Sequence, residues 1–165
     1  MIAIIADTHM PRGARRLPER CVELIGEAEA VIHAGDFFAL SAYEEIRALN
    51  PRLHAVWGNV DEPALGALLS ETLTVGLGGG RSLALVHDAG PAKGRLARLR
   101  RRFPAADAVV FGHSHLPLLE TGEGELAGFQ IFNPGSPTER RRAPRPSMGL
   151  LEVAPERLAF RHVWL

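Results

Sequence analysis

The sequence predicts an α/β protein in which two β-sheets pack against each other with helices on the outside. In the first third of the chain, short apolar runs alternate with segments of helical periodicity, which is the pattern of a parallel β-α-β-α-β unit. In the second half, short apolar runs follow one another between turns rich in glycine and proline. A length of 165 residues with 46% hydrophobic residues suits one domain with a proper core. We therefore expect a single domain over residues 1–165.

The first half is expected to contain three strands and two helices. Each strand is a short apolar run that stops at a polar residue, and these runs cover residues 2–6, 30–34 and 53–57. Between the first two strands, apolar residues recur at the spacing of one helix face over residues 17–28. Between the second and third strands, Ser41 is a candidate N-cap with Glu44 three residues later, which predicts a helix that runs to about Leu49.

The second half is expected to begin with a hairpin, because residues 73–77 and 82–86 flank the turn Gly78-Gly79-Gly80. Residues 91–103 carry apolar side chains at helical spacing. The remaining apolar runs predict short strands at residues 108–111, 117–120, 129–132, 148–153 and 158–163. The basic segment 139–146 contains proline and is expected to be one long loop.

Composition argues against several classes of protein. The formal net charge is zero and the pI is about 7.1, so no overall charge attracts the chain to nucleic acid or to an anionic membrane. No apolar run approaches the roughly 18 residues of a membrane span, and the start of the chain lacks the pattern of a signal peptide. The single cysteine, Cys21, excludes an intrachain disulfide. These features suit a reducing compartment, and we expect the protein in the cytoplasm, without a membrane partner.

Polar side chains that can bind metal ions follow five of the predicted strands. In an open α/β sheet, ligand sites lie outside the carboxyl ends of the strands, and each of these groups stands at such an end. Packing alone does not explain five in succession. The groups are Asp7 with His9, Asp36, Asn59, His87, and His113 with His115.

Each of these groups also has an ordinary structural explanation. Asp7-Thr8-His9 alone is weak, because aspartate and histidine are common in loops, and Gly35-Asp36 and Gly58-Asn59 are common turn dipeptides. Gly112-His113-Ser114-His115 is stronger, although alternate residues of a strand point to opposite faces. Both histidines can serve one site only if the chain bends, and we expect Gly112 to permit that bend.

Taken together, the motifs resemble those of the calcineurin-like metallophosphoesterase superfamily. The superfamily pattern is D-x-H, G-D, G-N-x-D/E, a lone histidine after a strand, and G-H-x-H, and its order and spacing are kept over nearly the whole chain. More narrowly, the chain looks like the small bacterial and archaeal phosphodiesterase branch, which also includes a eukaryotic retromer subunit of the same fold. That branch carries an N-P-G-S turn after the second histidine pair, which Asn133-Pro134-Gly135-Ser136 matches.

The resemblance implies a four-layer αββα sandwich, with two packed mixed β-sheets flanked by helices, and a centre of two divalent metal ions. Carried over residue by residue, one ion is bound by Asp7, His9, Asp36 and His115. The other is bound by Asp36, Asn59, His87 and His113, so that Asp36 bridges the two. Oxygen and imidazole ligands without a thiolate suit Mn²⁺, Fe, Zn²⁺, Ni²⁺ or Co²⁺, and we expect Mn²⁺.

Such a centre predicts a metal-dependent phosphoesterase acting on a small-molecule phosphate ester, and we expect a phosphodiesterase. A hydroxide that bridges two ions roughly 3.5–4 Å apart can attack phosphorus in line and so hydrolyse a P–O bond. We expect Asp61 to orient Asn59 or a ring nitrogen from behind the ligands. The expected catalytic residues are Asp36, Asn59, Asp61 and His113. The expected substrate-binding residues are Asn59, Arg140 and Arg141.

Two positions depart from the superfamily pattern. Val60 stands where many members have a histidine, a candidate general acid, and the phosphodiesterase branch often lacks that histidine too. Because valine has no proton to give, we expect diesters with good leaving groups to be preferred over alkyl monoesters. Asp88 stands within His87-Asp88-Ala89, where His-Gly-His is common, and adds a negative charge nearby. The segment between His87 and Gly112 is short, so we expect an open cleft without a capping subdomain.

Two other functions stay open on the sequence alone. A non-catalytic scaffold of the same fold could bind another protein, although all seven ligand positions are filled by the expected residue types, which favours an enzyme. A nuclease would need a basic track with stacking aromatic residues, and the 6% aromatic content ranks nucleic acid last among the partners. The arginines of the 139–146 loop keep that alternative open. The natural substrate and the formation of a homo-oligomer are not settled by the sequence.

Overall fold

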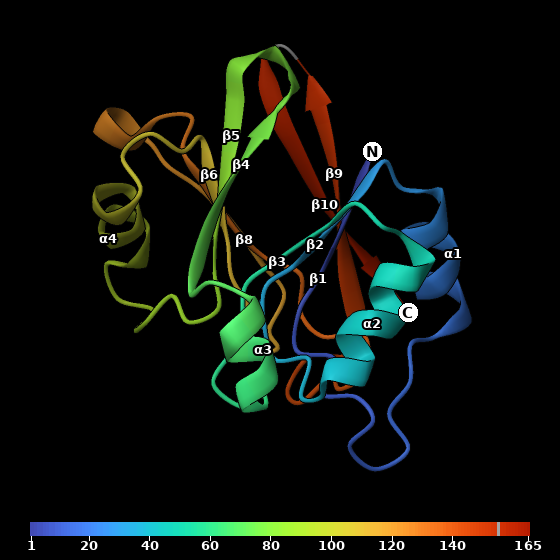
Figure 1. The fold of residues 1–165 in the computed structure, drawn as a ribbon. Coiled ribbons are helices and arrows are strands. Elements are labelled where there is room, and N and C mark those ends of the chain that lie inside the picture. Colours follow the sequence, from blue (N-terminus) through green and yellow to red (C-terminus); the bar gives the residue numbers. More distant parts are fainter. Residues whose placement is uncertain (155) are drawn as a thin grey trace.

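Two five-stranded β-sheets lie face to face in the middle of the molecule, and helices cover their outer faces (Figure 1). The computed structural model describes residues 1–154 and 156–165. Both sheets mix parallel and antiparallel pairs of strands. The layers therefore run helix, sheet, sheet, helix, which confirms the predicted αββα sandwich.

The first sheet has a parallel half and an antiparallel half. Its parallel strands are β1 (Ile2–Ile5), β2 (Ala30–His33) and β3 (Leu53–Ala55). The pairs β1–β2 and β2–β3 confirm the predicted β-α-β-α-β start. The strands β9 (Ser147–Ala154) and β10 (Arg157–Trp164) form an antiparallel pair, and β9 also runs antiparallel to β1. The strand order is β10-β9-β1-β2-β3.

The second sheet begins with the predicted hairpin. Its strands β4 (Thr72–Leu77) and β5 (Arg81–Val86) flank a short 3-10 turn at Gly78–Gly80. The strand β5 pairs parallel with β6 (Ala108–Val110), and β6 pairs parallel with β8 (Gln130–Asn133). The edge strand β7 (Leu118–Thr121) is antiparallel to β8, to which it is joined through a 3-10 turn at Gly124–Leu126.

Four α-helices among the described residues complete the fold. The helices α1 (Glu19–Glu27) and α2 (Leu40–Leu49) cover the first sheet, and α4 (Arg95–Arg102) covers the second (Figure 1). The helix α3 (Pro63–Leu68) lies at the lower end of the molecule in this view. It was not predicted, because 6 residues are too few to establish a helical period. Within the described residues, no helix is long and apolar enough to span a membrane.

Three predicted helix starts are wrong, two of them for a local reason. The helix α1 begins at Glu19, after Pro18, and not at residue 17. The helix α4 begins at Arg95 and not at residue 91, because Gly94 has a φ of 68°, outside the helical region.

The predicted N-cap of α2 is also wrong. The helix begins at Leu40, so Ser41 already lies inside its first turn, and no side chain bonds at the N-cap position. The Leu40 N–H group instead donates to Glu62 Oε1 (2.5 Å). Glu62 directly precedes α3, so a distant carboxylate satisfies a donor that we expected Ser41 to serve.

Apolar side chains fill the space between the sheets and hold every layer in place. Ile4 and Ile32 of the first sheet and Leu85 and Phe132 of the second are fully buried in one cluster. Phe132 stacks on Phe160 of β10 with ring centroids 4.8 Å apart. Two further clusters lie beneath the outer helices. Burial of β1, β2, β6 and β8 fixes the position of their ends.

The carboxyl ends of the parallel strands in both sheets meet at one end of the molecule. The strands β1, β2 and β3 run toward the lower end in Figure 1, and so do β5 and β6 of the other sheet. The five loops in which the sequence places metal ligands begin there.

Candidate metal centre

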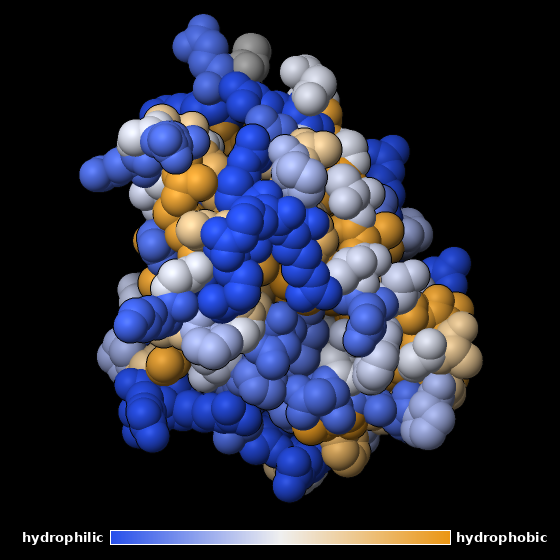
Figure 2. All heavy atoms as spheres, turned by 90° about the vertical axis from the view of Figure 1, so that its left-hand side faces the viewer, coloured by the Kyte–Doolittle hydropathy of each residue, from blue (hydrophilic) through white to orange (hydrophobic). Residues whose placement is uncertain are grey.

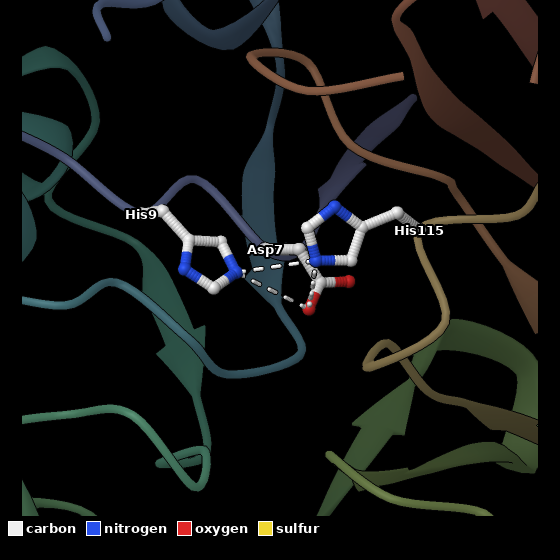
Figure 3. Close-up of side chains that lie close together, drawn as sticks. All are labelled: Asp7, His9 and His115. Atoms are coloured by element: carbon white, nitrogen blue, oxygen red, sulfur yellow. Dashed lines mark hydrogen bonds and ion pairs between the residues drawn. The ribbon is translucent and has the colours of Figure 1, made fainter. Parts of the chain in front are cut away.

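The first group of candidate ligands consists of Asp7, His9 and His115. Asp7 and His9 come from the loop after β1, and His115 comes from the loop after β6. The Nε2 atoms of His9 and His115 are 3.2 Å apart, and His115 Nε2 lies 3.5 Å from Asp7 Oδ1. Figure 3 shows the three side chains pointing toward one another. One ligand atom of each lies within 4.8 Å of the others, which is close enough for them to share one metal ion.

The second group contains Asp36, Asn59, His87 and His113, which follow β2, β3, β5 and β6. Asn59 Oδ1 lies 3.1 Å from His87 Nε2 and 2.9 Å from His113 Nδ1. Ligand atoms of Asp36, His87 and His113 also lie within 4.8 Å of one another. Four loops from two sheets therefore deliver oxygen and nitrogen donors to one place.

Asp36 lies between the two groups. Its Oδ2 atom is 3.2 Å from His87 Nε2 in the second group and 3.6 Å from His9 Nε2 in the first. Its Oδ1 atom accepts a hydrogen bond from the Val60 N–H group (3.1 Å). One carboxylate thus reaches both groups, which is the arrangement that a bridging ligand needs.

Five of the seven candidate ligands have a left-handed backbone conformation. The φ angles of these residues run from 46° at His9 to 68° at His113. Such angles are uncommon for residues other than glycine and cost of order 1–3 kcal/mol each. Strain of this kind clusters at functional sites, and here it accompanies the turning of alternate residues of a loop toward one centre. The five residues are Asp7, His9, Asp36, His113 and His115.

Glycines precede several ligands because the loops approach one another closely. A Cβ atom on Gly58 would lie 2.1 Å from Asp36 Oδ1, and one on Gly112 would lie 2.9 Å from Asp7 Oδ2. We expected Gly112 to provide the bend that brings both following histidines to one site. That expectation is wrong, because His113 and His115 themselves adopt the positive φ angles. Gly112 is required for close packing against the loop after β1.

Backbone carbonyls orient two of the imidazole rings. His87 Nδ1 donates to the Ala34 carbonyl (2.8 Å), and His115 Nδ1 lies 3.4 Å from the Glu139 carbonyl. A proton held on Nδ1 leaves the lone pair of Nε2 free to face the site. Both rings are therefore set in the tautomer that binds a metal through Nε2.

Asp61 acts differently from its predicted role. We expected its carboxylate to orient Asn59 or a ring nitrogen. Instead, Asp61 Oδ2 accepts hydrogen bonds from the Gly58 N–H (2.7 Å) and Asp36 N–H (3.2 Å) groups, and Oδ1 accepts one from the Phe38 N–H group (2.7 Å). The carboxylate therefore positions the backbone of two ligand loops.

The segment from Asn133, the last residue of β8, to Thr138 fastens the ligand loops, and its role was missed by sequence reasoning. Ser136 Oγ donates to the Asp7 carbonyl (2.8 Å), and Thr138 Oγ1 donates to the Thr8 carbonyl (2.8 Å). Asn133 Nδ2 donates to the Gly112 carbonyl (2.8 Å). The N-P-G-S motif indicated this segment, but the partners of Ser136 and Thr138 lie more than a hundred residues away in the chain.

His33 supports the same loops from behind. Its Nδ1 accepts a hydrogen bond from the Gly35 N–H group (3.2 Å), and its Nε2 lies 3.1 Å from Thr8 Oγ1. The ring is fully buried and stacks on Phe37 with centroids 3.5 Å apart. His33 is therefore a packed strand residue that also bonds to the loops after β1 and β2.

The two arginines predicted to bind substrate differ in position. Arg141 Nη1 donates to the His113 carbonyl (3.3 Å), and its charge contributes to the lowered pKa of His115. Arg140 Nη1 donates to the Ala143 carbonyl (3.3 Å) within its own loop. The fold thus brings Arg141 next to the ligands and engages Arg140 locally.

Burial dominates the electrostatics of the first group. It raises the pKa of Asp7 to about 8 and lowers the pKa of His115 to about 4. In the second group, burial is the largest single influence on the pKa of His87 and lowers it, but the hydrogen bond to Asp36 and the charges of Asp36 and Asp7 together make the net shift upward. Burial likewise raises the pKa of Asp36, but the hydrogen bond and charge of His87, together with the Val60 N–H bond, make the net shift downward.

Divalent metal ions fit the donors of both groups. Asp7 Oδ2 is buried and has no hydrogen-bond partner among the described residues, so a cation would satisfy an otherwise orphaned carboxylate oxygen. The donors are carboxylate and amide oxygens and imidazole nitrogens, without a thiolate, which is the set that Mn²⁺, Fe and Zn²⁺ bind.

Comparisons with known proteins agree with this geometry. Residues 1–156 match the family model of the calcineurin-like phosphoesterase superfamily domain. A probable metallophosphoesterase of Methanothermobacter thermautotrophicus is 30% identical over 166 aligned residues, which cover 96% of this chain and 88% of that protein. The chain therefore belongs to the calcineurin-like phosphoesterase superfamily.

Two solved structures have the same fold at low sequence identity. Wild-type Vps29 of Entamoeba histolytica, complexed with zinc, superposes with a TM-score of 0.76 at 23% identity, over 99% of this chain and 98% of that chain. An archaeal phosphodiesterase superposes with a TM-score of 0.73 at 22% identity, over 99% of each chain.

Proposed function

We propose that this protein is a phosphodiesterase with a dinuclear metal centre. The observation that carries the proposal is the convergence of seven side chains with candidate oxygen and nitrogen ligand atoms. They form two groups, and Asp36 lies close to ligand atoms of both. A purely structural core gains nothing from burying two carboxylates beside several imidazoles, because each buried charge needs a partner. Divalent ions supply those partners.

The ligand sets follow from the two groups. One ion belongs to Asp7, His9, Asp36 and His115, and the other to Asp36, Asn59, His87 and His113. We expect Mn²⁺, with Fe, Zn²⁺, Ni²⁺ and Co²⁺ as alternatives for the same donors. When bound, the ions would lower the pKa of a water molecule and neutralise negative charge on the phosphate.

The reaction is the hydrolysis of one P–O ester bond. The oxygen of water bonds to phosphorus, the bond to the leaving oxygen breaks, and one proton passes to the leaving oxygen, or to solvent when that group is a stable anion. Asn59 and His113 are the exposed members of the ligand set, so the phosphate approaches the centre past them. Arg141 adds positive charge beside His113.

The relatives support the proposal to different degrees. The likeness in fold to an archaeal phosphodiesterase supports a diester as the substrate of this protein. The zinc complex of Vps29 supports metal binding by this fold. Metal binding alone does not establish catalysis. The alternative of a non-catalytic protein-binding scaffold must therefore be tested by turnover.

The test compares bis(p-nitrophenyl) phosphate with p-nitrophenyl phosphate in the presence of Mn²⁺. We expect clear hydrolysis of the diester and weak hydrolysis of the monoester, and we expect a chelator to abolish both until Mn²⁺ is restored. A chain that holds two metal ions and hydrolyses neither ester would support the scaffold. Faster hydrolysis of the monoester would contradict the diester assignment.

The leaving group provides a second readout, because Val60 offers no proton to it. A positioned general acid contributes about 10²–10⁴-fold to such a step. We expect the wild-type rate to fall steeply as the pKa of the leaving group rises, and we expect Val60→His to flatten that dependence. A shallow dependence in the wild type would indicate a proton donor elsewhere in the site.

A further inference from the structure

A cavity of about 350 Å³ opens beside the second group of candidate ligands. Asn59 and His87 form the part of its wall that borders the metal centre. Its volume is at the lower end of the roughly 300–1,000 Å³ of ligand pockets, which suits one ring system of a substrate better than a long chain.

The rest of the wall comes from three separate elements. Trp57 follows β3 and is half-buried, Val86 ends β5, and Arg102 ends α4. The backbone N–H group of Trp57 donates to the Ser70 carbonyl (3.2 Å), and this bond holds the chain in place where it leaves β3. Because β3 and β5 also deliver Asn59 and His87, the cavity has a fixed position relative to the metal centre.

Charge restricts what the cavity can accept. Glu71 and Asp88 line it together with the single cation Arg102, whose Cζ lies 5.3 Å from the ring centroid of Phe103. One oxygen of Asp88 accepts a hydrogen bond from the Gly90 N–H group (2.7 Å). Two carboxylates against one guanidinium disfavour a second phosphate group, and they offer acceptors and donors to the polar edge of a neutral ring.

We propose that this cavity binds the nucleobase of a mononucleoside phosphodiester, with the base stacked on Trp57 and its polar edge facing Arg102, Glu71 and Asp88. This inference rests on the proposed phosphodiesterase function and names its substrate class. An aromatic platform with both donors and acceptors at its rim recognises a base, whereas a purely apolar aryl group would form no hydrogen bond with those polar groups. The net negative rim also excludes a continuing polynucleotide strand on this side.

The kinetic test uses two diesters with the same charge and the same leaving group. These are thymidine 5′-(p-nitrophenyl phosphate) and methyl p-nitrophenyl phosphate, assayed with Mn²⁺. We expect wild-type kcat/KM to favour the thymidine ester by about tenfold, within the range of base–aromatic stacking. Trp57→Ala should bring the ratio close to one, and Trp57→Phe should keep most of it. The control Trp164→Phe, on β10, should leave both rates unchanged.

A binding readout makes the test independent of turnover. The chain has 2 tryptophans, and Trp164→Phe leaves Trp57 as the source of the indole N–H signal in NMR spectra. Titration of the metal-free protein with thymidine should shift the Trp57 signal in a saturable way, and deoxyribose should not. A saturable shift without hydrolysis of either ester would support base binding in the cavity and contradict the proposed phosphodiesterase activity. Equal hydrolysis of both esters with no shift of the Trp57 signal would contradict base binding in the cavity and would still support phosphodiesterase activity.

Selection by charge gives a third arm. Glu71→Gln removes one negative charge from the rim, and we expect it to improve kcat/KM severalfold for a dinucleotide aryl ester, which carries an additional phosphate, relative to the thymidine ester. An unchanged ratio would show that the rim carboxylates do not select against a second phosphate.

Discussion

At the scale of single residues, Asp36 has the largest number of roles in the candidate centre. Its Oδ2 atom lies within 3.6 Å of a ligand from each group, while its Oδ1 atom and N–H group are bonded to the loop after β3. His87 serves the second group alone, and its Nδ1 is used by the Ala34 carbonyl. Removal of the Asp36 side chain and removal of the His87 side chain should therefore have different effects on metal binding and activity.

We predict that Asp36→Ala lowers metal content and kcat much more than His87→Ala. Loss of Asp36 removes a donor from both ions, whereas loss of His87 removes one donor from one ion. Metal analysis of the purified variants should find close to no bound ion for Asp36→Ala and one ion per chain for His87→Ala. Retention of most of the wild-type kcat by Asp36→Ala at saturating Mn²⁺ would contradict a bridging role.

Asp7 should couple metal binding to proton release. Burial raises the pKa of Asp7 to about 8, so the metal-free protein holds this carboxyl largely protonated at pH 7, and an ion must displace the proton. Affinity should therefore rise with pH up to about 8 and change little above it. Calorimetric titration with Mn²⁺ in buffers of different ionisation enthalpy should detect release of at least one proton at pH 7. The Asp7→Asn variant should release about one proton fewer than the wild type when it binds Mn²⁺. Equal proton release by the variant and the wild type would contradict the raised pKa of Asp7.

At the scale of elements, the segment from Asn133, the last residue of β8, to Thr138 connects the ligand loops of both sheets. Its side chains bond to backbone carbonyls of the loops after β1 and β6, so it fixes the backbone that carries Asp7 and His113. Ser136 is almost fully buried, which makes the loss of its hydrogen bond costly.

We predict that Ser136→Ala lowers the free energy of unfolding by about 1–3 kcal/mol and weakens Mn²⁺ binding about tenfold. The matched control is Ser41→Ala on the exposed face of α2, whose hydroxyl caps nothing. Its effect on stability should stay within about 0.5 kcal/mol. Denaturant unfolding of the metal-free proteins measures the first effect, and metal titration measures the second. Equal behaviour of the two serine variants would refute the positioning role of Ser136.

The helix α4 shows how an element can carry many arginines without forming a nucleic-acid track. Arg95 and Arg100 lie over the rings of Phe111 and Phe129, at 5.0 Å and 5.3 Å from the ring centroids. Arg98 Nη2 donates to the Ala89 carbonyl (2.7 Å). Figure 2 shows a hydrophilic patch over this helix with apolar surface on both sides. These arginines serve the packing of the helix, which leaves the nuclease alternative with little support from this face.

At the scale of the whole molecule, the packing of the two sheets determines whether the ligand groups meet. Asp7, Asp36 and Asn59 come from one sheet, and His87, His113 and His115 come from the other. The stack of Phe132 on Phe160 lies in the interface between the sheets, one residue before Asn133.

We predict that Phe132→Ala lowers the free energy of unfolding by about 3–5 kcal/mol, because it leaves a cavity between the sheets. Leu119→Ala, on the neighbouring edge strand, is the control, since Leu119 is 42% exposed. Its effect should be below about 1 kcal/mol. Urea unfolding of both variants provides the measurement, and similar losses of stability would show that the intersheet stack is not a main source of stability.

Local patterns alone were sufficient to locate the strands and to bring the candidate ligands together at the strand ends. Each buried strand appears as a short apolar run, and the change to a polar residue at Asp7, Asp36 or His87 marks its carboxyl end. Parallel strands place such ends at a common edge, so the prediction of one site needed no coordinates. The donor types likewise indicated oxygen- and nitrogen-binding metals. These features are local because burial along one strand is decided by the residues of that strand.

Only the tertiary structure decided how the loops support one another. Several supporting hydrogen bonds join segments that are distant in the chain. Glu62 caps α2, Asp61 accepts a bond from the Asp36 N–H group, and Ser136 donates to the Asp7 carbonyl. The left-handed turn at His113 is likewise imposed by neighbours, since isolated histidine does not favour it. A sequence pattern records which residues are buried, but a contact between two loops depends on the packing of both sheets, and that packing exists only in the complete fold.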